Sequence, residues 1–185
     1  INSNGQLVIN PQFDYAEDFH EGRASVCLGK PCDGWLSSGS GERWGYIDVS
    51  GKMVITPQYG SESDFSEGLA SVCTGDCGAY ATKSANRGYI DRDGKIAIPM
   101  QFGITSEFSE GLARVCVGLC RWKEKEGYSG KFGFIDHSGR FVINPQYDDA
   151  LDFKNGFAQV TVGKGDEAKI GYIDKTGKVV WQPSN

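Results

Sequence analysis

The chain has 185 residues, a formal net charge of -5, and 39% hydrophobic and 12% aromatic residues. This length and apolar content are sufficient for one domain or a short array of repeated units, and they argue against disorder. The Lys and Arg residues form no basic cluster, so we expect no nucleic-acid partner. No apolar run approaches the roughly 18 residues of a membrane span. Because the first residue is Ile1, we expect a processed product or an excised fragment from which any export signal is already gone.

The sequence repeats along its length. The motif GYID or GFID begins at Gly45, Gly88, Gly133 and Gly171, at separations of 43, 45 and 38 residues. Each copy continues with two variable residues and Gly, an apolar run, and in most copies Pro, Gln and an aromatic residue. An acidic residue followed by Phe and a segment similar to EGLASV complete the unit. The amino-terminal NGQLVINPQF and the carboxyl-terminal KVVWQP each contain part of a unit.

These segments predict short strands. Their apolar residues are β-branched or aromatic and lie between turn residues, and Asp-x-x-Gly is typical of a hairpin turn. The Pro that follows the apolar run is expected to end the strand. We therefore predict an all-β domain over residues 1–185, with about three short antiparallel strands per unit of ~38 to 46 residues and about four units, partial at each end. The array is either open and solenoid-like or propeller-like.

The apolar strand after GYID occurs five times, whereas GYID occurs four times. The first copy, Leu7, Val8 and Ile9, lacks the GYID partner on its amino-terminal side. An uncovered strand is a template for another chain. Either a neighbouring segment of this chain or a second molecule is expected to cover it.

The six cysteines align within the repeat as SVCLGKPC, SVCTGDC and RVCVGLC. In the fourth copy Thr161 and Gly165 replace both cysteines together, as expected for pairs that bond locally. Of the fifteen possible pairings, we predict Cys27 with Cys32, Cys73 with Cys77 and Cys116 with Cys120. The spacing fits neither c-type haem attachment nor a thioredoxin-like pair, and zinc is a remote alternative. Disulfides imply the periplasm, the cell surface or the extracellular medium.

We identify no catalytic residue, cofactor site or metal site in the sequence. His20 and His137 occupy variable turn positions, which favours surface roles over catalysis. The recurrent aspartates of the Asp-x-x-Gly segments are explained by turn formation. An enzymatic function is therefore not expected.

Four aromatic residues differ from the regular core positions because they lie in the unequal loops that follow the cysteines. They are Trp35, Tyr80, Trp122 and Tyr128. Repeat proteins commonly place binding surfaces where the units vary. These residues are candidates for binding a protein or a glycan.

The segment RWGYIDVSGKMVITPQYGSESDFSEGLASV resembles the WG-repeat family, whose unit contains Trp-Gly-Tyr-Ile-Asp, Gly-Lys, an apolar strand, Pro with an aromatic residue, and Phe-x-Glu-Gly-Leu-Ala-x-Val. The resemblance covers nearly the whole chain, although the Trp is retained only at Trp44. It implies a bacterial, all-β repeat protein that is often exported and serves as an interaction module without a known catalytic site.

Together these features predict an exported, non-enzymatic structural or interaction protein. Its expected partner is protein, including copies of itself assembled head to tail into an extracellular filament. The extra strand at Leu7 and the partial units at both ends favour assembly. The alternative is a monomeric module that binds a protein or glycan through the variable aromatic loops.

Overall fold

The computed structural model describes residues 4–29, 32, 43–75, 77, 86–118, 120–123 and 127–181, and these are almost entirely β-structure. The only helix among them is the short 3-10 helix η1, Gly165–Glu167. The strands are β1 Tyr15–Ala16, β2 Arg23–Leu28, β3 Arg43–Asp48, β4 Met53–Tyr59, β5 Ser61–Glu62, β6 Leu69–Thr74, β7 Asn86–Asp91, β8 Ile96–Phe102, β9 Ile104–Thr105, β10 Ala113–Val117, β11 Trp122–Lys123, β12 Gly127–Tyr128, β13 Lys131–Ile135, β14 Phe141–Tyr147, β15 Asp149–Ala150, β16 Phe157–Val162, β17 Lys169–Asp174 and β18 Val179–Trp181.

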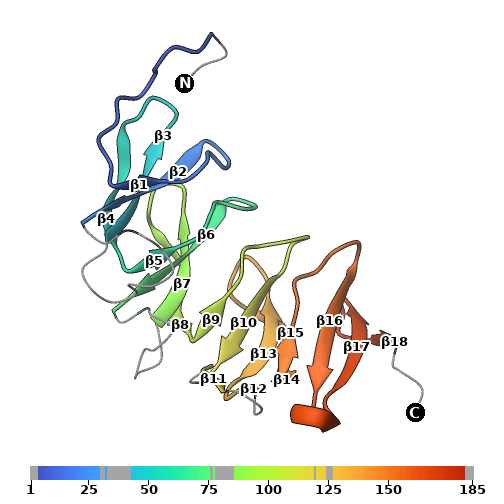
Figure 1. Cartoon of the computed structure of the whole chain (residues 1–185). Coiled ribbons are helices and arrows are strands. Elements are labelled where there is room, and N and C mark those ends of the chain that lie inside the picture. The colour runs from blue at the N-terminus through green and yellow to red at the C-terminus, as the bar shows by residue number, and fades with distance from the viewer. Residues whose placement is uncertain are drawn as a thin grey trace.

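The strands form four antiparallel sheets of four strands each, which follow one another in chain order from one end of the molecule to the other (Figure 1). The sheets are β1-β2-β3-β4, β5-β6-β7-β8, β9-β10-β13-β14 and β15-β16-β17-β18, and β11 and β12 form a separate hairpin. We call each four-stranded sheet with its turns a unit. The prediction of an all-β repeat fold is confirmed. Each unit also begins with a strand of only two residues, shortly after a segment that runs from Pro to an aromatic residue, 11–13, 57–59, 99–102 or 145–147.

Pro57, Pro99 and Pro145 lie inside strands, so the prediction that these prolines end the strands was wrong. Pro57 is part of β4, at a bulge where the pairing with β3 shifts between Trp44–Tyr59 and Tyr46–Ile55. A bulge leaves residues out of the ladder and therefore tolerates a residue without an N–H group. The opposing Gly45 is required there, because a Cβ at this position would lie 2.6 Å from the Pro57 nitrogen.

Two kinds of turn connect the strands, and the sequence predicts the first of them. In the Asp-x-x-Gly turn, Asp48 Oδ1 accepts hydrogen bonds from the backbone N–H groups of Ser50 and Lys52, at 2.9 and 3.1 Å. In the Glu-Gly turn, Glu21 and Gly22 have positive φ values of 50° and 78°. Two consecutive residues in this conformation give the tight hairpin turn that suits the twist of antiparallel strands.

The core lies between the sheets, because each sheet packs one face on the next. We call the face of a sheet that points towards the following unit its forward face and the opposite face its back face. Between the first and second sheets, forward residues such as Tyr46 and Ile55 pack against Ala70, Val72 and Ile90 of the second sheet. Two similar clusters join the second sheet to the third and the third to the fourth. The stacked arrangement is an open array in the described part of the chain.

Residues 4–14 cover the back face of the first sheet. Ile9 and Phe13 pack against a cluster that includes Val26 and Ile47. A Cβ at Gly51 would contact the side chain of Ile9, just as one at Gly94 would contact Ile55 of the preceding unit. The amino-terminal segment therefore packs on the first sheet as each preceding unit packs on the next one in the array.

Leu7, Val8 and Ile9 form no strand, so the strand assigned to them from the sequence was wrong. Every β4-like strand pairs with the GYID strand of its own unit, and none of the described GYID strands pairs with these residues. Leu7 and Val8 consequently remain exposed, at 58% and 56%.

Candidate functional site

The three predicted disulfides are present. Cys27–Cys32, Cys73–Cys77 and Cys116–Cys120 each have a Cα–Cα distance of 6.0 Å, within the usual range for a disulfide. In each pair, the first cysteine lies in the second strand of its sheet and the second cysteine follows the turn after that strand. Three disulfides indicate an oxidising environment outside the cytoplasm. Among the described residues no helix has the length and apolar character needed to cross a membrane.

The fourth unit lacks the disulfide, and a carboxylate binds the turn after its second strand. Asp148 Oδ2 accepts a hydrogen bond from the Gly163 N–H at 3.0 Å, and Asp148 Oδ1 lies 2.7 Å from Lys131 Nζ. The aligned residue in the third unit is Gly103, where a Cβ would lie 2.8 Å from Cys120 Sγ. In the first unit, however, Asp14 accepts the same hydrogen bond from the Gly29 N–H at 3.1 Å beside the Cys27–Cys32 disulfide, so the carboxylate and the disulfide are compatible.

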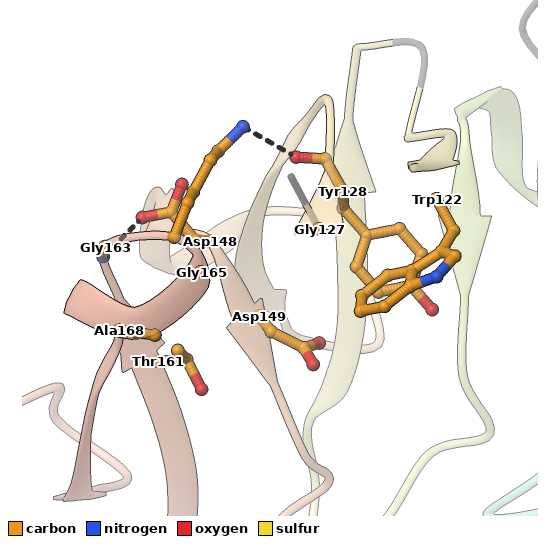
Figure 2. Close-up of a pocket in the computed structure, with 10 residues that line it drawn as sticks. Trp122, Gly127, Tyr128, Asp148, Asp149, Thr161, Gly163, Gly165 and Ala168 are labelled. Atoms are coloured by element: carbon orange, nitrogen blue, oxygen red, sulfur yellow. Dashed lines mark hydrogen bonds between the residues drawn. The ribbon is translucent and has the colours of Figure 1, made fainter. Parts of the chain in front are cut away.

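A pocket of about 250 Å³ lies beside this position, between the third and fourth units (Figure 2). One wall is the hairpin β11–β12, and the other consists of fourth-unit residues, including Thr161 and Gly165, which align with the missing cysteines. Lys164 Nζ donates to the Tyr128 carbonyl oxygen at 3.1 Å and joins the two walls. The pocket thus lies where the fourth unit lacks the disulfide of the other units.

Two of the four predicted aromatic binding residues meet in this pocket. The rings of Trp122 and Tyr128 are edge to face, with centroids 5.0 Å apart, and Trp122 is 61% exposed. Figure 2 shows the Asp149 carboxylate directed towards these two rings. Trp35 and Tyr80 lie outside the described residues. The sequence did not identify Asp148, Asp149 or Lys164 as site residues, although the paired replacement at Thr161 and Gly165 marks the place.

A second set of contacts joins consecutive units through aromatic pairs. The aromatic residue of each of the first three GYID-type motifs packs edge to face on the Phe of the following unit, and all the side chains involved are buried. The pairs are Tyr46–Phe65, Tyr89–Phe108 and Phe134–Phe153, with centroid distances of 5.0, 5.0 and 4.8 Å. At the two ends of the array the equivalent rings are open to solvent: Phe19 is 43% exposed and Tyr172 is 39% exposed.

Glutamates of the Glu-Gly turns form a third set of contacts between units. Each accepts a hydrogen bond from the Gly N–H of the next Glu-Gly or Asn-Gly turn and pairs with a basic side chain of the next Asp-x-x-Gly turn. The sets are Glu21 with Gly68 and Arg92, Glu67 with Gly111 and His137, and Glu110 with Gly156 and Lys175. Hydrogen bonds from Arg92 to Glu21 and from Lys175 to Glu110 lower the pKa of each carboxyl group. At the two ends of the array the corresponding positions are neutral. In the first unit Val49 stands at the position of the basic residue, and in the fourth unit Asn155 stands at the position of the glutamate.

Both histidines lie at contacts between units. His20 Nε2 lies 3.2 Å from Asp64 Oδ2 of the second unit. His137 Nε2 lies 3.2 Å from Glu67 Oε2 of the second unit, and its ring stacks on Phe108 of its own unit at 4.2 Å. Both side chains remain about half exposed, at 49% and 42%. Burial and the neighbouring Asp64 raise the pKa of Glu62 to about 7. Among the described residues, no three His, Cys, Asp or Glu side chains are placed to hold a metal ion.

The stacked sheets, repeated turns and contacts between units define an all-β tandem-repeat protein. The family model described as WG containing repeat matches residues 1–30, 44–76, 88–118 and 132–165, which is more than half of the chain. The chain therefore belongs to the WG-repeat family, as its sequence motifs predict, and this membership supports a structural or interaction role. No curated protein matches the chain.

Proposed function

We propose that this protein is an exported, non-enzymatic interaction module that assembles head to tail. The observation that carries the proposal is the exposure of Tyr172 and Phe19 at opposite ends of the array. The corresponding rings form buried pairs between all neighbouring units within the chain. When the fourth unit of one copy meets the first unit of the next, Tyr172 and Phe19 form the same pair. Because the two surfaces differ, the contact is heterologous and continues into a filament.

Charged residues at the two ends are complementary. His20 lies beside Asp64 of the following unit. Lys154 aligns with His20, and Asp18 aligns with Asp64. Repeating the internal geometry between two copies therefore brings Lys154 of one copy next to Asp18 of the other.

The neutral ends of the glutamate series also match. In the same arrangement Asn155 of one copy faces Gly22 and Val49 of the next. An Asn side chain can accept a hydrogen bond from the Gly22 N–H. Since Val49 offers no cation, a neutral partner avoids an unpaired carboxylate at the contact.

Sedimentation and electron microscopy of the purified protein over a range of concentrations test this proposal. We expect end-to-end assembly that grows with concentration. Lys154→Glu or Asp18→Lys should weaken association by about fivefold, as for a partly exposed ion pair, and the double variant Lys154→Glu/Asp18→Lys should restore it. Lys95→Glu, which lies in an internal turn, serves as the control. A protein that stays monomeric at all concentrations would refute the proposal.

The pocket between the third and fourth units favours a second candidate function, the binding of a single sugar ring. Small-molecule sites combine apolar and aromatic walls with a few polar groups, and a volume of about 250 Å³ suits one ring rather than an extended ligand. The exposed Trp122 face can pack on the C–H face of a sugar, and Asp149 and Thr161 can bond to its hydroxyl groups.

A glycan array followed by calorimetry tests the second function. Trp122→Ala should reduce the affinity of any glycan that binds by at least about tenfold, and Asp149→Asn should reduce it less. Val49→Ala, a change of an exposed side chain at the other end of the array, should have no effect. Binding that is unchanged in Trp122→Ala would exclude this pocket as the site.

A further inference from the structure

We infer that two copies are joined by strand donation: residues 6–13 of one copy pair with β17 of the preceding copy and replace β18. This inference rests on the proposed head-to-tail assembly and specifies how the contact is made. A second copy of this chain would thus cover the open forward face of the fourth sheet.

The amino-terminal segment has the sequence of the strand that it would become. LVINPQF, residues 7–13, aligns with MVITPQY of β4 and FVINPQY of β14. In the structure this segment forms no strand, yet Ile9 and Phe13 already contact the first sheet as Ile55 and Tyr59 contact the second. The element that it lacks is a GYID strand beside it, and β17 of another copy is such a strand.

The carboxyl-terminal strand fits the same place less well. Its sequence, VVWQPSN, has Trp181 where the other units have a buried Ile, and Asn185 where they have an aromatic residue. All three residues of β18 are exposed, with Trp181 at 52%, whereas Ile55 and Ile143 are each 3% exposed. An exposed strand contributes little burial and is the easier one to displace.

The register of the donated strand follows from the internal units. Tyr46 pairs with Ile55 and Ile47 with Met53. By alignment, Ile9 would pair with Tyr172, and Leu7 with Ile173 of the preceding copy. β18 uses the same two positions, where Tyr172 pairs with Trp181 and Ile173 with Val179. Donation and β18 pairing therefore exclude one another.

The forward face of the completed sheet would then match the internal ones. Phe13 would supply the aromatic residue that position 185 lacks, opposite Ile170. Tyr172 would reach Phe19, and the second copy's own first sheet would cover the joint. Strand pairing and sheet stacking would thus form together, since the donated strand is attached to the sheet that packs on it.

Two variants test the inference: one strengthens the pairing of β18 with β17, and the other weakens it. The triple variant Trp181→Ile/Ser184→Gln/Asn185→Tyr gives the carboxyl-terminal strand the sequence of the internal strands, so β18 should stay in place. We expect its assembly to require at least about tenfold higher concentration than the wild type. Val180→Pro removes β18 pairing, and assembly should then begin at lower concentration. Thermal unfolding of each variant reports whether the four units remain folded.

The outcomes separate the two proposals. If the wild type assembles and the triple variant assembles equally well or better, stacking occurs with β18 in place and strand donation is refuted. Simple stacking predicts that result, because the triple variant completes the forward face. If the wild type is monomeric at every concentration, both the assembly and the strand donation are refuted. Opposite shifts in the two variants would support strand donation.

Discussion

The third and fourth units have the same strand order but differ at two places. The loop after β10 is closed by the Cys116–Cys120 disulfide, whereas the loop after β16 is held by Asp148. The forward face of the third sheet is buried under the fourth unit, whereas the forward face of the fourth sheet is open. Only the second difference follows from position in the array. The first is a local change in sequence, and it leaves space for the pocket beside Thr161.

This difference shows that stacking between units and closure of the loops place their sequence requirements on different parts of each unit. Stacking requires apolar residues at fixed positions of every sheet, and those positions vary little between the units. The loop after the second strand needs only to be closed, by a disulfide, by a carboxylate, or by both as in the first unit. Variation is therefore tolerated at the loops, where binding can develop, while the stacking surface stays uniform.

The largest expected effect comes from removing the aromatic ring of the GYID-type motif, which can be done in both the third and the fourth unit. Phe134→Ala removes a fully buried side chain and should lower the free energy of unfolding by about 3 to 5 kcal/mol. Tyr172→Ala removes a ring that is 39% exposed and should cost less than about 1 kcal/mol in the monomer. Chemical denaturation at a concentration at which the protein is monomeric measures both. Equal losses would show that the fourth sheet's forward face is covered within one chain.

The next effect compares the two ways of closing the loop. Cys116→Ser/Cys120→Ser should cost about 2 kcal/mol, from the chain-entropy estimate for so short a loop. Asp148→Ala should cost about 1 to 2 kcal/mol, because it leaves the Gly163 N–H and Lys131 without their acceptor.

Reductant and acid test the disulfide of the third loop and the carboxylate of the fourth loop separately. Burial acts to raise the pKa of Asp148, but hydrogen bonds from Lys131 and Gly163 outweigh it and hold the pKa below its ordinary value of 3.8. The contribution of Asp148 is therefore present above pH ~4 and is lost as the pH falls through the lowered pKa. Hydrogen exchange should show the third loop opening in reductant and the fourth opening in acid. A fourth loop insensitive to acid would contradict this assignment.

The sequence predicted the repeat, the hairpin turns and the disulfides because each leaves a local pattern of residues. It did not predict two-residue strands such as β5, which are too short to show alternation. The strand predicted at Leu7 was wrong because a strand requires a partner, and the sequence of one segment does not show whether a partner is present. The pocket was also missed, since its walls come from an insertion in one unit and a replacement in the next.

The smallest expected effect concerns the pair that joins the two units. Glu110 of the third unit lies 3.1 Å from Lys175 of the fourth, and the hydrogen bond from Lys175 lowers the pKa of the glutamate. A lowered carboxyl pKa stabilises the protein above the pKa of the unfolded state, and this stabilisation is lost as the pH falls through the folded-state pKa. Glu110→Gln should therefore lower the melting temperature by no more than about 2 °C near neutral pH. The difference from the wild type should vanish in acid.

Calorimetry across the pH range measures this difference, with Glu167→Gln, an exposed acid of η1, as the control. The amide can still accept a hydrogen bond from the Gly156 N–H but cannot pair with the Lys175 charge. A loss that persists unchanged at low pH would therefore indicate that shape or hydrogen bonding, rather than charge, holds the third and fourth units together at this turn. In that case the neutral Asn155 could fill the same role at the next contact without a basic partner, and the absence of a cation at Val49 would not weaken the joint between two copies.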